Sequence, residues 1–252
     1  MAHTIAVINQ KGGVGKTTTA INLGAYLAKM GRQVLLVDLD PQGNATSGLG
    51  LDKQNLNSTM YDVLFNEAEA ASTIRETNIT GLLILPANAQ LAAAEVDLAT
   101  EAKREYKLKE ALANLTYDYI LIDCPPALGL LTINALTAAD KVLIPVQAEY
   151  YAMEGLGQLL DIIQRVRSGL NGRLEILGVV VTMFDSRNSL AEQVVSELKK
   201  HFGDKVMSTI VPRNVRLAEA PSYGKSIAQH DKWSKGARAY KQLAKEVDKR
   251  LA

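Results

Sequence analysis

Seven short segments of the chain are rich in apolar residues, and most of them are continuous apolar runs rather than alternating ones. They span residues 5–9, 33–38, 82–86, 118–123, 141–146, 176–182 and 206–211. A continuous apolar run is typical of a strand that is buried on both faces, as in a parallel sheet covered by helices. The pattern therefore predicts a mostly parallel sheet.

Segments with helical periodicity lie between the predicted strands. They span residues 17–30, 108–115, 156–166 and 189–201, and a final helix is expected at 235–251. Alternation of strands and helices over residues 1–252 predicts a single doubly wound α/β domain with helices on both faces of the sheet. Residues 213–233 contain Pro, Gly and polar residues and are expected to be irregular.

Composition narrows the protein class. Apolar residues make up 47% of the chain, yet no apolar run approaches the ~20 residues that span a bilayer. The first strand begins near Thr4, which leaves no room for a signal peptide, so a cytosolic protein is expected. The single cysteine, Cys124, excludes an intrachain disulfide and a cluster held by several cysteines of one subunit. We interpret Cys124 as a small core residue rather than a redox switch.

Charge is distributed unevenly along the chain, although the net charge is only +1. Residues 1–186 carry 14 Lys/Arg and 20 Asp/Glu, a net −6, whereas residues 187–252 carry 14 and 7, a net +7. A basic final quarter is compatible with a nucleic-acid surface or with a solvated helical face. Lys241, Lys245 and Lys249, spaced by four residues, share one face of the final helix and fit either interpretation.

A glycine-rich segment between the first strand and the first helix carries the strongest chemical signal. Its glycines let backbone N–H groups point at phosphate oxygens, and the helix adds its positive end. In such a P-loop the lysine reaches the β- and γ-phosphates and the threonine hydroxyl binds Mg²⁺. The expected ATP-binding residues are Lys11, Gly12, Gly13, Val14, Gly15, Lys16, Thr17 and Thr18, with Lys16 also catalytic and Thr17 also a metal ligand.

The loop departs from the ordinary P-loop pattern, because Gln10 stands where a glycine is expected and Lys11 is an additional lysine. This variant resembles the deviant Walker A motif of the ParA/MinD group of ATPases. The resemblance implies that two subunits enclose two ATP molecules and that Lys11 reaches the phosphates of the partner's nucleotide. A second cation there would stabilise the charge of phosphoryl transfer, so Lys11 is a candidate catalytic residue.

Two acidic segments follow predicted strands, at the sheet edge where α/β proteins bind ligands. Asp123 precedes Cys-Pro-Pro and is interpreted as the Walker B acid, which holds Mg²⁺ through water. Asp40 resembles the family's switch aspartate, a catalytic residue that positions the attacking water and contributes to the metal site. Asp38 is structural or supports the metal. A cap or turn role before Pro41 remains open for both Asp38 and Asp40.

Further motifs resemble the Soj-type branch of ParA over essentially the whole chain. They are Asp-Leu-Asp-Pro-Gln-Gly-Asn-Ala-Thr at 38–46, Leu-Leu-Thr-Ile-Asn-Ala at 130–135 and Val-Pro-Arg-Asn-Val-Arg at 211–216. By analogy with that branch, Pro212 and Asn214 are expected to border the adenine. Their alternatives are a strand-ending proline and a turn residue.

The resemblance to that branch implies an ATP-dependent homodimer that binds double-stranded DNA without sequence preference. It also implies weak basal turnover, stimulated by the basic N-terminal segment of a ParB-type centromere-binding protein, and a location on the nucleoid. The resemblance points to Arg187 and Arg216 as DNA contacts, and both lie in the basic quarter. Lysine and arginine contacts to phosphate give affinity without reading bases.

Other functions in the same superfamily fit less well. A membrane-positioning switch like MinD needs an amphipathic C-terminal tail with bulky apolar residues, and this tail carries no Trp or Phe. A nitrogenase-type iron protein needs two cysteines per subunit. A nucleotide-binding regulator that does not hydrolyse ATP is disfavoured by the presence of Lys11 and Asp40. DNA partition is therefore the expected function, and the MinD-like switch is the alternative.

Overall fold

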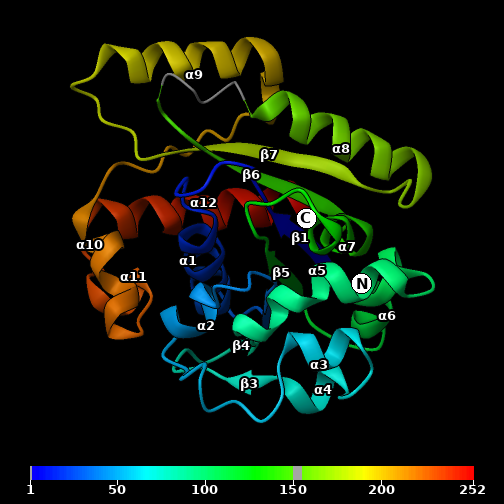
Figure 1. The fold of residues 1–252 in the computed structure, drawn as a ribbon. Coiled ribbons are helices and arrows are strands. Elements are labelled where there is room, and N and C mark those ends of the chain that lie inside the picture. Colours follow the sequence, from blue (N-terminus) through cyan, green and yellow to red (C-terminus); the bar gives the residue numbers. More distant parts are fainter. Residues whose placement is uncertain (1, 150–154) are drawn as a thin grey trace.

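A seven-stranded sheet runs through the centre of the computed structural model, which describes residues 2–149 and 155–252 (Figure 1). The strand order is β3-β4-β2-β5-β1-β6-β7, and all neighbours are parallel except β3 and β4. The strands are β1 (His3–Val7), β2 (Val34–Asp38), β3 (Arg75–Glu76), β4 (Leu82–Leu85), β5 (Tyr119–Asp123), β6 (Lys141–Gln147) and β7 (Glu175–Thr182). The predicted fold class is confirmed.

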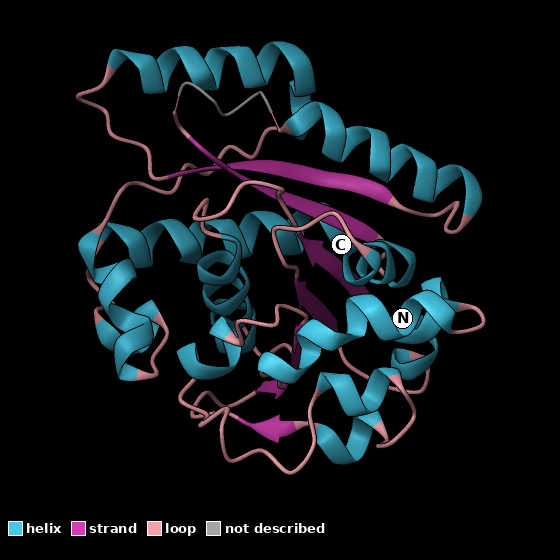
Figure 2. Ribbon diagram, in the orientation of Figure 1, coloured by secondary structure: helices cyan, strands magenta, loops and turns pink. Residues whose placement is uncertain are grey.

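Helices cover both faces of this sheet (Figure 2). Those that carry the α label in Figure 1 are α1 (Lys16–Lys29), α2 (Asn44–Gly48), α3 (Met60–Leu64), α4 (Ala70–Thr73), α5 (Ala94–Asp97), α6 (Lys107–Leu112), α7 (Leu130–Ala138), α8 (Leu156–Gly169), α9 (Ser189–Phe202), α10 (Val215–Glu219), α11 (Ile227–His230) and α12 (Lys235–Leu251). One apolar core lies under α7, α8 and α9, and a second lies under α1 and α12. Because both faces are covered, the central strands are fully buried, which explains their continuous apolar sequences.

The register of the parallel strands brings the ends of three of them together. Val7 of β1 lies opposite Asp123 of β5, and Asp38 of β2 lies opposite the same Asp123. The loops that follow β1, β2 and β5 therefore leave the sheet at one edge.

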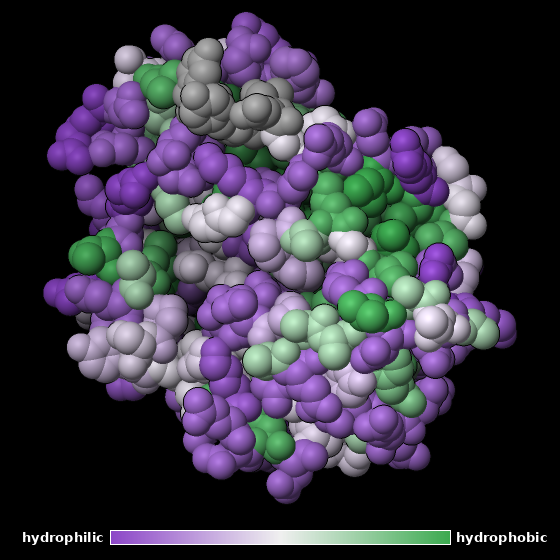
Figure 3. All heavy atoms as spheres, viewed as in Figure 1, coloured by the Kyte–Doolittle hydropathy of each residue, from purple (hydrophilic) through white to green (hydrophobic). Residues whose placement is uncertain are grey.

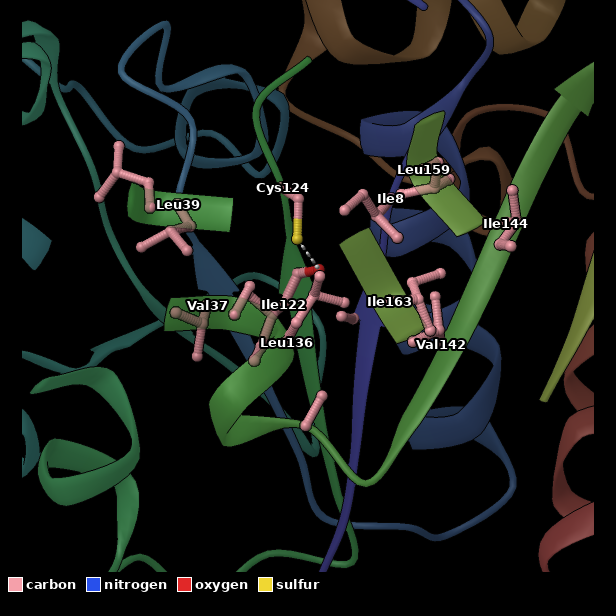
Figure 4. Close-up of a cluster of buried hydrophobic side chains, with 14 of the residues drawn as sticks. Ile8, Val37, Leu39, Ile122, Cys124, Leu136, Val142, Ile144, Leu159 and Ile163 are labelled. Atoms are coloured by element: carbon pink, nitrogen blue, oxygen red, sulfur yellow. Dashed lines mark hydrogen bonds between the residues drawn. The ribbon is translucent and has the colours of Figure 1, made fainter. Parts of the chain in front are cut away.

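Cys124 follows β5 and packs in the first of these cores, beside Ile8, Leu39 and Ile122 (Figure 4). Its thiol donates a hydrogen bond to the Ile122 carbonyl at 3.7 Å. Burial raises the pKa of the Cys124 thiol, so the reactive thiolate is disfavoured. These contacts support the interpretation of Cys124 as a core residue.

The predicted seventh strand at 206–211 is wrong. Only Val206 forms an isolated bridge to β7, and the N–H groups of Ser208 and Thr209 donate instead to the Glu246 carboxylate of α12. The Met207 and Val211 N–H groups still donate to the Val179 and Val181 carbonyls of β7, at 2.8 Å each, so the segment runs along β7 without forming a regular strand. The short antiparallel β3 occupies the other edge of the sheet and was not predicted.

Residues 213–233 were expected to be irregular, but they contain α10, the 3₁₀ helix Ala220–Tyr223 and α11. Short helices of this kind lack a long periodic pattern, so they cannot be predicted from hydrophobic periodicity. Ser226 and Gln229 form a capping box at the start of α11.

The final helix α12 buries Ala237, Tyr240, Leu243, Ala244 and Val247 against the sheet. Most of the face in Figure 3 is hydrophilic, including the α9 region, and hydrophobic residues gather beside α7 and α8. Among the described residues, no helix combines the length and apolar character that crossing a bilayer requires.

Replacing Glu246 with alanine is expected to lower the free energy of unfolding by about 2 kcal/mol, because charge-assisted hydrogen bonds to two backbone N–H groups are lost. Urea unfolding measures the change. Glu192→Ala on α9, an exposed position, serves as the matched control and should change stability by less than about 0.5 kcal/mol. Equal effects of the two substitutions would contradict the assignment.

Candidate functional site

The glycine-rich loop follows β1 and ends where α1 begins. Gly13 and Gly15 have φ angles of 75° and 90°, a left-handed conformation that residues with a Cβ rarely adopt. Gly15 directly precedes the first residue of α1. The Thr182 hydroxyl at the end of β7 donates to the Val14 carbonyl at 2.8 Å and so ties the loop to a strand two places away from β1 in the sheet.

Lys16 lies in the curve of this loop and is only 7% exposed. Its ammonium group donates to the Lys11 carbonyl at 3.1 Å. Burial lowers the pKa of Lys16, and the Asp123 carboxylate acts in the opposite direction. The structure therefore holds a cation beside a loop of the P-loop type.

Asp123 is fully buried at the end of β5, and neither of its carboxylate oxygens has a hydrogen-bond partner among the described residues. Burial raises the pKa of Asp123 well above its ordinary value, and the neighbouring Asp38 carboxylate raises it further. The nearby Thr17 hydroxyl and the positive charge of Lys16 lower the pKa of Asp123 and so oppose part of this rise. A buried carboxylate without partners is costly unless a ligand completes it.

Asp38 has partners on both oxygens. The Thr46 hydroxyl and backbone N–H donate to Asp38 Oδ2 at 2.6 and 2.8 Å, and the Asp40 N–H donates to Oδ1 at 3.3 Å. Burial nevertheless raises the pKa of Asp38 to about 6. These bonds organise the loop that follows β2, as the structural interpretation of Asp38 requires.

Asp40 is 8% exposed and accepts a hydrogen bond from the Gln42 N–H at 2.9 Å. A hydrogen bond from the N–H two residues further on is typical of an acid in a turn, which is the alternative role considered for Asp40. The Asp40 charge also opposes the lowering of the Lys16 pKa. The structure thus brings Lys16, Asp40 and Asp123 to one edge of the sheet.

A cavity of about 300 Å³ adjoins the loop, between the end of β7 and α10. Pro212 and Asn214 line it together with Gly15 and Thr18. The Asn214 Oδ1 atom is buried and has no hydrogen-bond partner among the described residues. Most of the lining is apolar, and such a pocket with one free acceptor suits a flat ring that carries a donor.

The described residues include no group of three His, Cys, Asp or Glu side chains arranged to bind a metal ion. Mg²⁺ is commonly bound by one or two protein groups together with substrate phosphates and water. The unpartnered Asp123 oxygens fit that arrangement.

Lys11 lies at the outer side of the loop, with its ammonium group 3.9 Å from the Glu149 carboxylate. The same carboxylate accepts from the Arg213 guanidinium at 3.3 Å. Sequence reasoning missed Glu149, Arg213 and the Thr182 contact, because each lies far along the chain from the loop.

Arg187 follows β7, and Arg216 lies in α10. Arg187 is paired with Asp185, which it contacts through Nε and Nη2 at 2.9 and 2.7 Å. Arg216 contacts Glu219 at 2.8 Å and Asp231 at 3.8 Å. Arg187 and two cations that sequence reasoning did not single out as DNA contacts line one hollow; these are Arg213 and Lys235.

A family model described as an AAA domain matches residues 2–176. The chain is 56% identical to the sporulation initiation inhibitor protein Soj of Bacillus subtilis, over 98% of both chains. It is 53% identical to the chromosome partitioning protein ParA of Caulobacter vibrioides, over 97% of this chain and 93% of that one.

Among solved structures, cobyrinic acid a,c-diamide synthase from Mycobacterium smegmatis with a bound ATP analogue and magnesium is 41% identical. Its TM-score is 0.86, with 97% of this chain and 93% of that chain covered. The identity to the two relatives over nearly the whole chain shows that it belongs to the Soj/ParA family of chromosome-partitioning ATPases.

Proposed function

We propose that residues 1–252 act as one ATPase domain that partitions DNA by an ATP-controlled cycle of dimerisation and DNA binding. The observation that carries this proposal is the arrangement at the sheet edge. A left-handed glycine loop, a buried lysine and a buried, unpartnered carboxylate meet beside an apolar pocket. Phosphates, a metal ion and a purine would each find matching groups there.

The residues of the loop would hold the phosphates of ATP through backbone N–H groups, and Lys16 would neutralise their charge. Pro212 would pack on the adenine, and the free Asn214 Oδ1 atom would accept from its amino group. Asp40 would orient the attacking water as a general base or positioning group.

Asp123, Asp40 and the Thr17 hydroxyl would hold Mg²⁺ directly or through water. The ion supplies electrostatic stabilisation of the phosphate charge during hydrolysis. The support for Asp123 is its pair of buried oxygens without partners, since a divalent ion would remove the cost of burying that charge.

Lys11 would act across a dimer, on the nucleotide of the partner subunit. Its ammonium group lies at the outer side of the loop, 39% exposed, so a second subunit could reach it. A homodimer closed over ATP would also align the basic surfaces of both subunits, which raises DNA affinity by simultaneous phosphate contacts.

Arg187 and Arg216 would form the centre of that DNA surface, joined by the cations that share the hollow with Arg187. We place the protein in the cytoplasm, on the nucleoid, with a ParB-type partner that stimulates hydrolysis. A MinD-like membrane role finds little support, because the apolar residues of α12 are buried against the sheet rather than free for lipid.

Lys16→Ala is expected to abolish ATP binding, because the cation that faces the phosphates is lost. Asp40→Ala should bind ATP normally and lose turnover at least about tenfold, since its role begins after binding. Fluorescent-nucleotide titration and phosphate release measure the two effects. Normal affinity in Lys16→Ala would refute the loop assignment, and unchanged turnover in Asp40→Ala would exclude it from catalysis.

Stability should depend on pH through Asp38 and Asp123. Both have a raised pKa in the folded chain, so the folded state binds protons that the unfolded state releases. Without Mg²⁺ and nucleotide, the free energy of unfolding is expected to rise as pH falls from about 7 to about 5. Urea unfolding at several pH values measures the slope, which Asp123→Asn should reduce. An unchanged slope in that variant would show that Asp123 does not contribute to the pH dependence of stability.

DNA binding is expected only with ATP and should weaken steeply as salt increases. Arg187→Glu should lower DNA affinity at least about tenfold, because a phosphate contact becomes a repulsion in each subunit of the dimer. Lys109→Glu, a reversal at an exposed position of α6, is the matched control. Binding titrations at several salt concentrations, with dimerisation followed by light scattering, test the surface. Wild-type affinity in Arg187→Glu would remove Arg187 from it.

A further inference from the structure

A carboxylate from a separate helix caps α7, the helix that begins where the loop after Asp123 ends. Glu95 of α5 accepts hydrogen bonds from the N–H groups of Leu130 and Leu131, at 2.8 and 3.2 Å. The first N–H groups of a helix have no partner within the helix, and a negative charge there also interacts favourably with the helix dipole. Figure 1 shows α5 beside α7.

The fit between Glu95 and this helix is tight. A Cβ atom at Gly129 would collide with the Glu95 carboxylate, so alanine at this position would push the carboxylate away from the start of α7. The Thr132 hydroxyl of α7 donates to the Ala127 carbonyl at 2.6 Å, which ties the loop back onto the helix. The six residues between Asp123 and α7 are therefore held at their far end by a carboxylate from another element.

The segment that carries Glu95 is anchored at its other end to α2, the short helix that follows the Asp40 loop. The Ala87 N–H donates to the Thr46 hydroxyl at 3.0 Å, and that hydroxyl donates to Asp38. Asn88 then caps the 3₁₀ helix Ala89–Ala93, which runs directly into α5. Residues 87–97 thus connect the loop that carries Asp40 with the loop that follows Asp123.

We propose that Glu95 is a positioning residue for ATP hydrolysis, acting through α7 on the loop that follows Asp123. This inference rests on the proposed ATPase function. Glu95 touches none of the residues assigned to phosphate or adenine binding, so its contribution belongs to turnover and not to nucleotide affinity. A carboxylate that only stabilised the fold would affect neither.

Glu95→Gln tests this role, because the amide keeps the shape but can offer only one acceptor oxygen to two N–H donors. Turnover per folded molecule should fall at least about fivefold, since small displacements of catalytic groups are costly, while the dissociation constant for ADP stays within about twofold. Glu110→Gln on α6, exposed and without a side-chain hydrogen bond among the described residues, is the control and should leave both values unchanged.

A double-mutant cycle compares the effect of Gly129→Ala on turnover with and without the Glu95 carboxylate. It separates the contact between the two residues from a general loss of stability. In the wild-type background the added methyl group should displace the Glu95 carboxylate and lower turnover to a similar degree. In the Glu95→Ala background the space is free, so the same substitution should change turnover by less than about twofold.

The outcomes separate the two proposals. Wild-type protein that binds ATP but does not hydrolyse it would refute the ATPase function, and with it the role of Glu95. Normal wild-type turnover, together with Glu95→Gln turnover within twofold of wild type or equal effects of Gly129→Ala in both backgrounds, would overturn the role of Glu95 alone. Loss of turnover with retained ADP affinity and a non-additive cycle would establish it.

Discussion

The parallel pairing of β2, β5 and β1 is the constraint on which the site depends. Parallel strands end at a common edge, and their register sets Val7 and Asp38 on either side of Asp123. The glycine loop, the Asp40 loop and the loop before α7 therefore start from adjacent positions. A slip of one residue in β5 would turn the Asp123 side chain toward the opposite face of the sheet.

Burial of charge at this edge explains why the site is suited to a ligand. Lys16 and Asp123 are both removed from water. The loss of solvation lowers the pKa of Lys16 and raises the pKa of Asp123, because burial disfavours the charged form of each group. Neither Asp123 oxygen has a hydrogen-bond partner among the described residues, whereas Asp38 accepts two hydrogen bonds from Thr46. Two adjacent carboxylates thus differ in role because one has hydrogen-bond donors around it.

The surface predicted for DNA differs from this edge, because its charges are exposed and paired. Arg187 and Arg216 both contact acidic neighbours in the folded chain. Exposed ion pairs contribute little free energy, so such pairs leave the arginines able to exchange a carboxylate for a phosphate. An interaction built from many such exchanges is weak in one subunit and strong in a dimer, which suits a reversible cycle.

Local signals in the sequence were sufficient for the strands β1, β2 and β4–β7, for the conformation of the glycine loop after β1 and for the positions of the acids that end β2 and β5. Continuous apolar runs and glycines that must adopt positive φ act over a few residues, so they are visible without a structure. Contacts between distant segments could not be predicted from the sequence. The Glu246 carboxylate accepts hydrogen bonds from a segment that was predicted to be a strand. Glu149 pairs with Lys11, and Glu95 caps α7. Each of these contacts joins residues more than 30 positions apart. Only the folded chain decides which carboxylate reaches which backbone N–H or cation, because that choice depends on how the helices pack on the sheet.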